Sequence, residues 1–174
     1  MNAKPREREF ELVEIDADHA KGAAFNMLFA IWRFHTHYEP YRRCVHWLGL
    51  LAQRHPGGLG MLHVVEPTAI PPDAPTRRLF AEVMRNPSVR HYSVVHTARG
   101  FKAASIRAVV ATSFALSRTH AAHSVHSNVD EAAGWVAEQQ RRLGRSETRE
   151  QIARVTEALR ALHRERYPGD LHAP

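Results

Sequence analysis

Histidine offers the widest choice of chemistry in this chain, because an imidazole can transfer protons or bind a metal. The chain has 13 histidines, and those that lie close together in sequence are His35 and His37, His91 and His96, and His120, His123 and His126. Residues two apart share a face of a strand and residues three apart share a face of a helix, so the first and the last of these groups have a spacing that metal ligands use. However, no Asp or Glu directly adjoins any of these histidines, and no His-Glu-x-x-His motif occurs. We therefore predict no metal site.

Other residues of catalytic use do not form a known arrangement either. Cys44 lies in an apolar helical stripe, where a thiol packs as a small hydrophobic group. No Gly-x-Ser-x-Gly motif occurs, and Gly57-Gly58-Leu59-Gly60 precedes a strand rather than a helix, so it is a turn and not a phosphate-binding loop. Only scattered polar residues support an enzyme. We predict a non-enzymatic protein with no catalytic residue and no cofactor.

Aromatic residues are concentrated in one part of the chain. Seven of the 14 Phe, Tyr and Trp residues fall within residues 25–47. We interpret most of them as core. The alternative is that one aromatic face lines a ligand cavity or a seam between two copies of the chain.

The positive charge is also unevenly distributed. The net charge is +6, yet residues 1–72 and residues 129–174 each carry eight basic and eight acidic residues. The whole excess lies in residues 73–128, which suits an anionic partner such as a phosphorylated ligand, a lipid headgroup or an acidic protein face. Solvated arginines are the simpler interpretation, because the chain has 21 Arg and three Lys. No Lys/Arg run exceeds two residues, so the pattern does not predict nucleic-acid recognition.

Length and composition indicate one globular domain. A chain of 174 residues with 44% hydrophobic residues can bury a single core. One cysteine cannot form an internal disulfide, which favours a reducing cytoplasm. The first residues contain no apolar signal segment, and no apolar stretch approaches the length of a membrane span. We therefore expect a cytoplasmic protein without a membrane span.

The apolar patterns predict alternating strands and helices. The expected strands are residues 10–15, 26–35, 59–65, 91–96 and 123–127, and a turn at Lys21-Gly22 makes the first two antiparallel. Helices are expected from Thr36 as N-cap to His55-Pro56, before Asn86-Pro87, and over residues 101–117, 129–143 and about 146–166. This order predicts an α/β fold with a mostly parallel five-stranded sheet and flanking helices at 8–143. Residues 144–174 add an amphipathic helix and a tail.

Four stretches of the chain carry a family resemblance: AIWRF, HPGGLGMLHVVEPTAIPPDAPTRRLFAEVM, VVHTARGFKAASIRAVV and SNVDEAAGWVAEQ. With their element order they resemble the STAS-like fold of anti-sigma-factor antagonists, and more closely the small stand-alone STAS-like proteins of myxobacteria. The resemblance covers about residues 8–140. It implies a central sheet flanked by helices, with partner binding or phosphorylation near the loop after the third strand.

That loop, residues 66–76, differs from the family pattern in its motif. Antagonist members carry Asp-x-Ser/Thr-Gly there and are switched by phosphorylation of the hydroxyl, whereas this loop has Thr68 and Thr76 but no Ser/Thr-Gly pair. The possible phosphorylation sites in this loop are therefore the hydroxyls of Thr68 and Thr76. Thr76 lies beside Arg77 and Arg78, whose positive charges would suit a phosphate. Four prolines in the loop favour a rigid, preformed docking surface.

Together these features predict a regulatory or protein-interaction domain that docks a protein partner, with an acidic face suiting its basic surface. The expected partner-binding residues are Thr68, Asp73, Thr76, Arg77, Arg78, Arg99 and Lys102. The alternative is a small-molecule or lipid-binding module at the edge where the carboxyl ends of the parallel strands, at Glu66, Thr97 and Ser127, converge. The apolar stripe of the last helix either packs back on the sheet or joins two copies in a homodimer.

Overall fold

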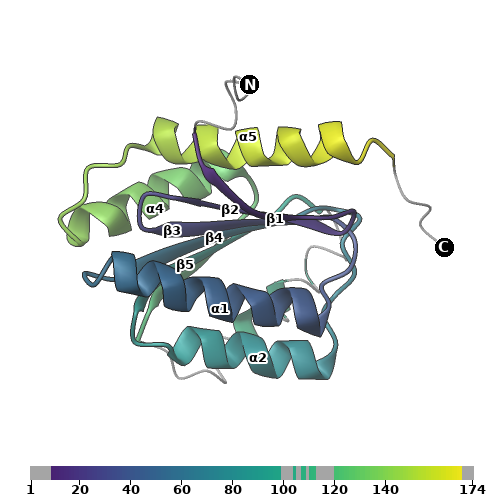
Figure 1. The fold of residues 1–174 in the computed structure, drawn as a ribbon, viewed down its shortest axis with the longest axis horizontal. Helices are drawn as coiled ribbons and strands as arrows, with labels where there is room; N and C mark the ends of the chain where they lie inside the picture. The colour runs from purple at the N-terminus through teal and green to yellow at the C-terminus, as the bar shows by residue number, and fades with distance from the viewer. Residues whose placement is uncertain (1–8, 99–103, 105–106, 109, 113–119, 170–174) are drawn as a thin grey trace.

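A six-stranded sheet lies between two layers of helices in the computed structural model (Figure 1). The structure describes residues 9–98, 104, 107–108, 110–112 and 120–169. The strands are β1 (Glu11–Ile15), β2 (His19–Ala24), β3 (Met27–Trp32), β4 (Leu59–Val65), β5 (Val89–His96) and β6 (Ala122–His126). The helices are α1 (Tyr38–Arg54), α2 (Ala74–Arg85), α4 (Val129–Arg142) and α5 (Arg149–Arg166). The expected helix at 101–117 lies largely outside the described residues.

The strands follow one another across the sheet in chain order. The pairs β1–β2 and β2–β3 are antiparallel, and β3, β4, β5 and β6 are parallel. The α/β class and the mostly parallel sheet are confirmed, and so are the bounds of the strand at 59–65. The predicted count of five strands is wrong, because the sheet has six.

The missed strand is β2, where the sequence predicted only a turn. Lys21 pairs with Ala30, and Gly22 pairs with Phe29, so this segment separates the two strands that were expected to pair with each other. Its small residues allow close packing, since a Cβ on Gly22 would lie 2.9 Å from Phe10 Cδ2. The turn between β2 and β3 is at Phe25-Asn26, where Phe25 has a φ of 58°. The start of α1 also differs, because its N-cap is His37 rather than Thr36 and has no side-chain cap.

Each face of the sheet has its own apolar core. One core lies between the sheet and helices α1 and α2 and includes Leu48, Met61 and Tyr92. The other lies beneath α4 and α5 and includes Phe29, Val136 and Leu159. Cys44 is fully buried in the first core, as expected for a packing residue, and burial raises the pKa of its thiol to about 11.

The C-terminal helix is part of this layered fold. Helix α5 contacts α4, β2 and β3, and its apolar residues Ile152, Val155 and Leu159 are buried against the sheet. Of the two alternatives for this stripe, the structure therefore shows packing on the sheet of the same chain. Within the described residues, no helix combines the length and the apolar character that crossing a bilayer would require.

Candidate functional site

The segment between β4 and α2, residues 66–73, is attached along its length to the connection between β3 and α1. The backbone N–H of Ile70 donates to the carbonyl of Phe34 at 2.6 Å, and the Thr68 hydroxyl donates to the carbonyl of Arg33 at 2.5 Å. At its end, Asp73 Oδ1 accepts a hydrogen bond from the backbone N–H of Thr76 at 2.8 Å and so caps α2. We call this segment the proline loop.

The residues expected to bind a partner differ in their exposure to solvent. The exposed ones are Thr68, Asp73, Arg77 and Arg78. Thr76 is only 1% exposed, so a phosphorylating enzyme would reach its hydroxyl only after local opening. Arg99 and Lys102 lie outside the described residues.

A cavity of about 90 Å³ lies beneath the proline loop, at the carboxyl ends of β3, β4 and β5. Its aromatic walls come from Trp32, Tyr41, Phe80 and Tyr92. Ligands of open α/β sheets usually bind at this edge of the sheet. The volume suits a group on the order of one small ring.

His63 of β4 is the polar centre of this cavity. Its ring is 2% exposed, and its Nδ1 lies 3.3 Å from Trp32 Nε1 and 2.7 Å from the Tyr92 hydroxyl. An indole N–H can only donate, so Nδ1 must be the acceptor and the neutral ring carries its proton on Nε2. Burial lowers the pKa of His63 to about 3, and the nearby Lys21 ammonium acts in the same direction. The imidazole is therefore neutral near pH 7.

The other end of this ring has no partner. His63 Nε2 is buried and makes no hydrogen bond, and the same holds for the hydroxyls of Tyr41 and Thr76, which also line the cavity. The Tyr41 hydroxyl still has the Tyr92 hydroxyl as a polar neighbour, and the Thr76 side chain interacts with the Asp73 carboxylate. His63 Nε2 is thus the most isolated of the three atoms.

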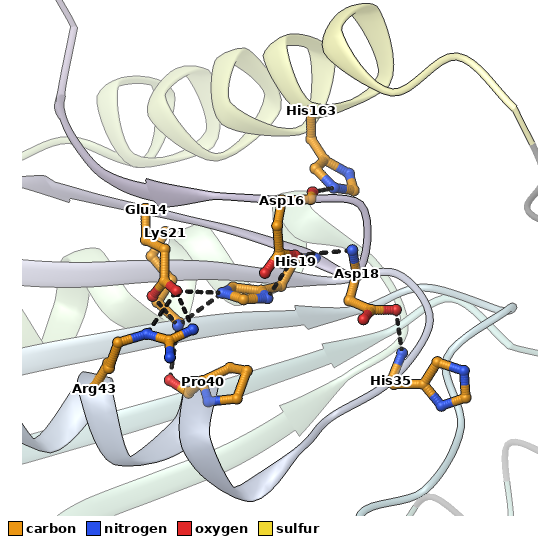
Figure 2. A network of polar contacts seen from close by, with 9 residues as sticks. All are labelled: Glu14, Asp16, Asp18, His19, Lys21, His35, Pro40, Arg43 and His163. Atoms are coloured by element: carbon orange, nitrogen blue, oxygen red, sulfur yellow. Dashed lines mark hydrogen bonds and ion pairs between the residues drawn. The ribbon is translucent and has the colours of Figure 1, made fainter.

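A second polar cluster lies on the same face of the sheet, around the buried side chain of Lys21 (Figure 2). Lys21 Nζ lies 2.6 Å from Glu14 Oε2, 2.7 Å from the Pro40 carbonyl and 2.9 Å from His19 Nε2. These three contacts use all three N–H groups of the Lys21 ammonium. His19 Nδ1 lies 2.9 Å from Asp16 Oδ1, and Arg43 also donates to Glu14. We call these five residues the Lys21 network: Glu14, Asp16, His19, Lys21 and Arg43.

The Lys21 network includes the one group of metal-ligand type found among the described residues. Ligand atoms of Glu14, Asp16 and His19 lie within 4.8 Å of one another. The Lys21 ammonium already contacts two of these residues, so a cation would have to displace a charge of the same sign. Burial would raise the pKa of Glu14, but hydrogen bonds from Arg43 and Lys21 outweigh it and lower that pKa to about 2. The cluster is thus an ion-pair arrangement around a fully paired ammonium, and it ties β1 and β2 to α1. His19 Nδ1 is its one buried atom without a hydrogen bond of good geometry.

A buried carboxylate marks the same edge of the sheet on its other face. Arg160 Nε and Nη2 donate to Glu66 Oε1 and Oε2 at 2.8 and 2.9 Å, and Arg164 donates to Oε1 at 3.2 Å. Burial would raise the pKa of Glu66, but these arginines lower it. With its lone pairs taken, Glu66 fixes α5 to the end of β4 rather than offering a free carboxylate.

No family model, no curated protein and no solved structure matches this chain. The STAS-like resemblance therefore stays a prediction, and the function has to be argued from the site. Sequence reasoning missed His63 and Tyr92. It did raise a ligand cavity as one role for the aromatic residues at 25–47, and Trp32 and Tyr41 from that segment line the cavity.

Proposed function

We propose that the chain is a binding module for a small, largely apolar ligand that occupies the cavity beneath the proline loop. The observation that carries this proposal is the unpartnered His63 Nε2 in the wall of an otherwise mostly apolar cavity. Buried polar atoms nearly always have a hydrogen-bond partner, and leaving one without costs about 1–3 kcal/mol. A ligand that supplies the missing partner would recover that free energy on binding.

The rest of the cavity suits the same role. Small-molecule sites are usually preformed hollows with apolar and aromatic walls and a few polar groups that fix the orientation of the ligand. Here the proline loop is hydrogen-bonded to the segment after β3, so the wall does not need to be ordered on binding. Apart from Arg77, whose exposed guanidinium lies at the rim, the polar side chains that line the cavity are neutral, which suits an apolar ligand.

The test compares two variants that introduce the same bulk at different places. Val65 lines the cavity, whereas Val125 is also half-buried on a parallel strand but does not line it. Val65→Phe should abolish binding of ring-sized probes such as toluene, phenol and acetophenone in ligand-observed NMR, and Val125→Phe should keep it. Binding that survives Val65→Phe, or no probe binding together with a clean apo mass in native mass spectrometry, would contradict the proposal.

A second candidate is docking of an acidic protein partner on the proline loop. The observation that favours it is an exposed apolar residue beside exposed cations, since Ile70 is 42% exposed and Arg77 and Arg78 follow on α2. An affinity pull-down should recover a stoichiometric partner that is lost in Arg77→Glu/Arg78→Glu. The matched control is Arg85→Glu, an exposed arginine in the last turn of the same helix.

A further inference from the structure

The chemical class of the ligand follows from the hydrogen atoms that the cavity presents, and this inference rests on the proposed function. The Trp32 indole N–H fixes His63 Nδ1 as an acceptor. The same nitrogen then accepts from the Tyr92 hydroxyl at 2.7 Å. His63 Nε2–H is therefore a committed donor, and the ligand must bring an acceptor to it.

Charge in the cavity narrows the class further. Among the described residues that line it, Arg77 is the only one with a formal charge, and its exposed guanidinium donates to the Pro72 carbonyl at the rim. A charged group placed beside His63 would find no free counter-charge, because the nearby buried ammonium of Lys21 is already paired with Glu14. Burying an unpaired charge costs several kcal/mol. An uncharged acceptor has no such penalty.

We propose that the cavity selects an uncharged, ring-sized ligand with a neutral acceptor, such as a carbonyl oxygen, which accepts the hydrogen bond donated by His63 Nε2–H. Trp32 acts as a positioning residue, because its indole N–H holds the proton of His63 on the nitrogen that faces no protein partner. The Tyr41 and Thr76 hydroxyls can rotate to donate or accept and do not restrict the class.

The test uses two probes of the same shape. Acetophenone and α-methylstyrene differ in one group, because the carbonyl oxygen of the first is a CH2 in the second. The preference for acetophenone over α-methylstyrene, measured as the ratio of their dissociation constants, should be about tenfold larger in the wild type than in His63→Phe. Comparing the two proteins in this way cancels the difference in hydration between the two probes. Benzoate, which adds a charge, should bind at least tenfold more weakly than acetophenone.

A second measurement does not depend on His63→Phe folding. Imidazole ¹⁵N shifts of the wild type should show the proton on Nε2 of His63, and acetophenone but not α-methylstyrene should perturb that nitrogen. This inference would be overturned if the two probes had the same ratio of dissociation constants in the wild type and in His63→Phe, if the proton were on Nδ1, or if benzoate bound as tightly as acetophenone. Each of these outcomes would leave the proposed function standing. Failure of every uncharged probe to bind would overturn the proposed function itself.

Discussion

Two polar clusters lie on one face of the same sheet, and they differ in how completely the central side chain of each is hydrogen-bonded. In the Lys21 network, each of the three ammonium N–H groups has an acceptor within 2.9 Å. In the cavity, His63 is bonded through Nδ1 and unpartnered at Nε2. The first cluster lies at the antiparallel end of the sheet and the second at the carboxyl edge of the parallel strands.

Trp32 connects the two clusters. The His19 ring stacks on it at 5.2 Å, Lys21 Nζ lies 5.4 Å from its ring centroid, and its indole N–H points to His63. The difference between the clusters then follows from charge. A buried ammonium without partners costs several kcal/mol, whereas an unpaired neutral N–H costs about 1–3 kcal/mol. Only the neutral group can be left available for a ligand in a stable fold.

The largest expected effect tests whether the Lys21 ammonium is as fully paired as its three short distances indicate. Lys21→Met removes the ammonium, so His19 Nε2 and the Pro40 carbonyl lose their donor and Glu14 keeps only the hydrogen bond from Arg43. We expect a loss of about 3–5 kcal/mol in the free energy of unfolding, measured by urea denaturation.

The control for this prediction is an ion pair at the surface. Arg54 and Glu11 lie 3.0 Å apart with side chains 54% and 53% exposed. Arg54→Met should change the free energy of unfolding by less than about 1 kcal/mol. Equal losses for the two variants would contradict the contrast between a buried network and a solvated pair.

The Lys21 network also shows where prediction from sequence reached its limit. The strand at 59–65 was predicted with its observed bounds, because a run that is mostly apolar on both faces suits a central strand. The segment that became β2 has a lysine and a glycine at its centre, which is typical of a turn. Its burial depends on Glu14 and on the Pro40 carbonyl, and no local pattern shows that those partners will meet Lys21.

The cavity was predictable in place but not in chemistry. The carboxyl edge of the parallel strands and the aromatic residues of 25–47 each offered a ligand site as the alternative interpretation. His63, however, is a single histidine inside an apolar strand, and its partners Trp32 and Tyr92 are 31 and 29 residues away in sequence. A lone polar residue within a buried strand was the available signal, since such a residue needs a partner from another element.

The next largest effect concerns acid, which should weaken the two clusters in different pH ranges. The pKa of His63 is about 3 in the fold against 6.5 for an ordinary histidine, so below pH 6.5 the unfolded chain binds a proton that the folded chain does not. Stability from His63 is complete above pH 6.5 and falls as the pH is lowered. The pKa of Glu14 is about 2 against 4.5, so its contribution is lost only below pH 4.5.

Urea denaturation at several pH values measures this difference. Between pH 6.5 and 4.5 the wild type should lose about 1.4 kcal/mol per pH unit more than His63→Phe, which is about 2–3 kcal/mol over the range. If the two proteins show the same slope, His63 is not held neutral, and the contrast between a charged and a neutral cluster fails.

The smallest effect compares two buried hydroxyls that differ in their hydrogen bonds. Thr156 on α5 is 0% exposed and donates to the Ile152 carbonyl at 2.9 Å, whereas the hydroxyl of Thr76 on α2, 1% exposed, makes no hydrogen bond. The same substitution, Thr to Val, removes a hydroxyl and keeps the shape at both places. Thr156→Val should lower the free energy of unfolding by about 1 kcal/mol, and Thr76→Val should lower it by less, because the Thr76 hydroxyl makes no hydrogen bond of good geometry and loses only its interaction with the Asp73 carboxylate. A loss at Thr76 equal to that at Thr156 would show that the cavity wall is already satisfied without a ligand.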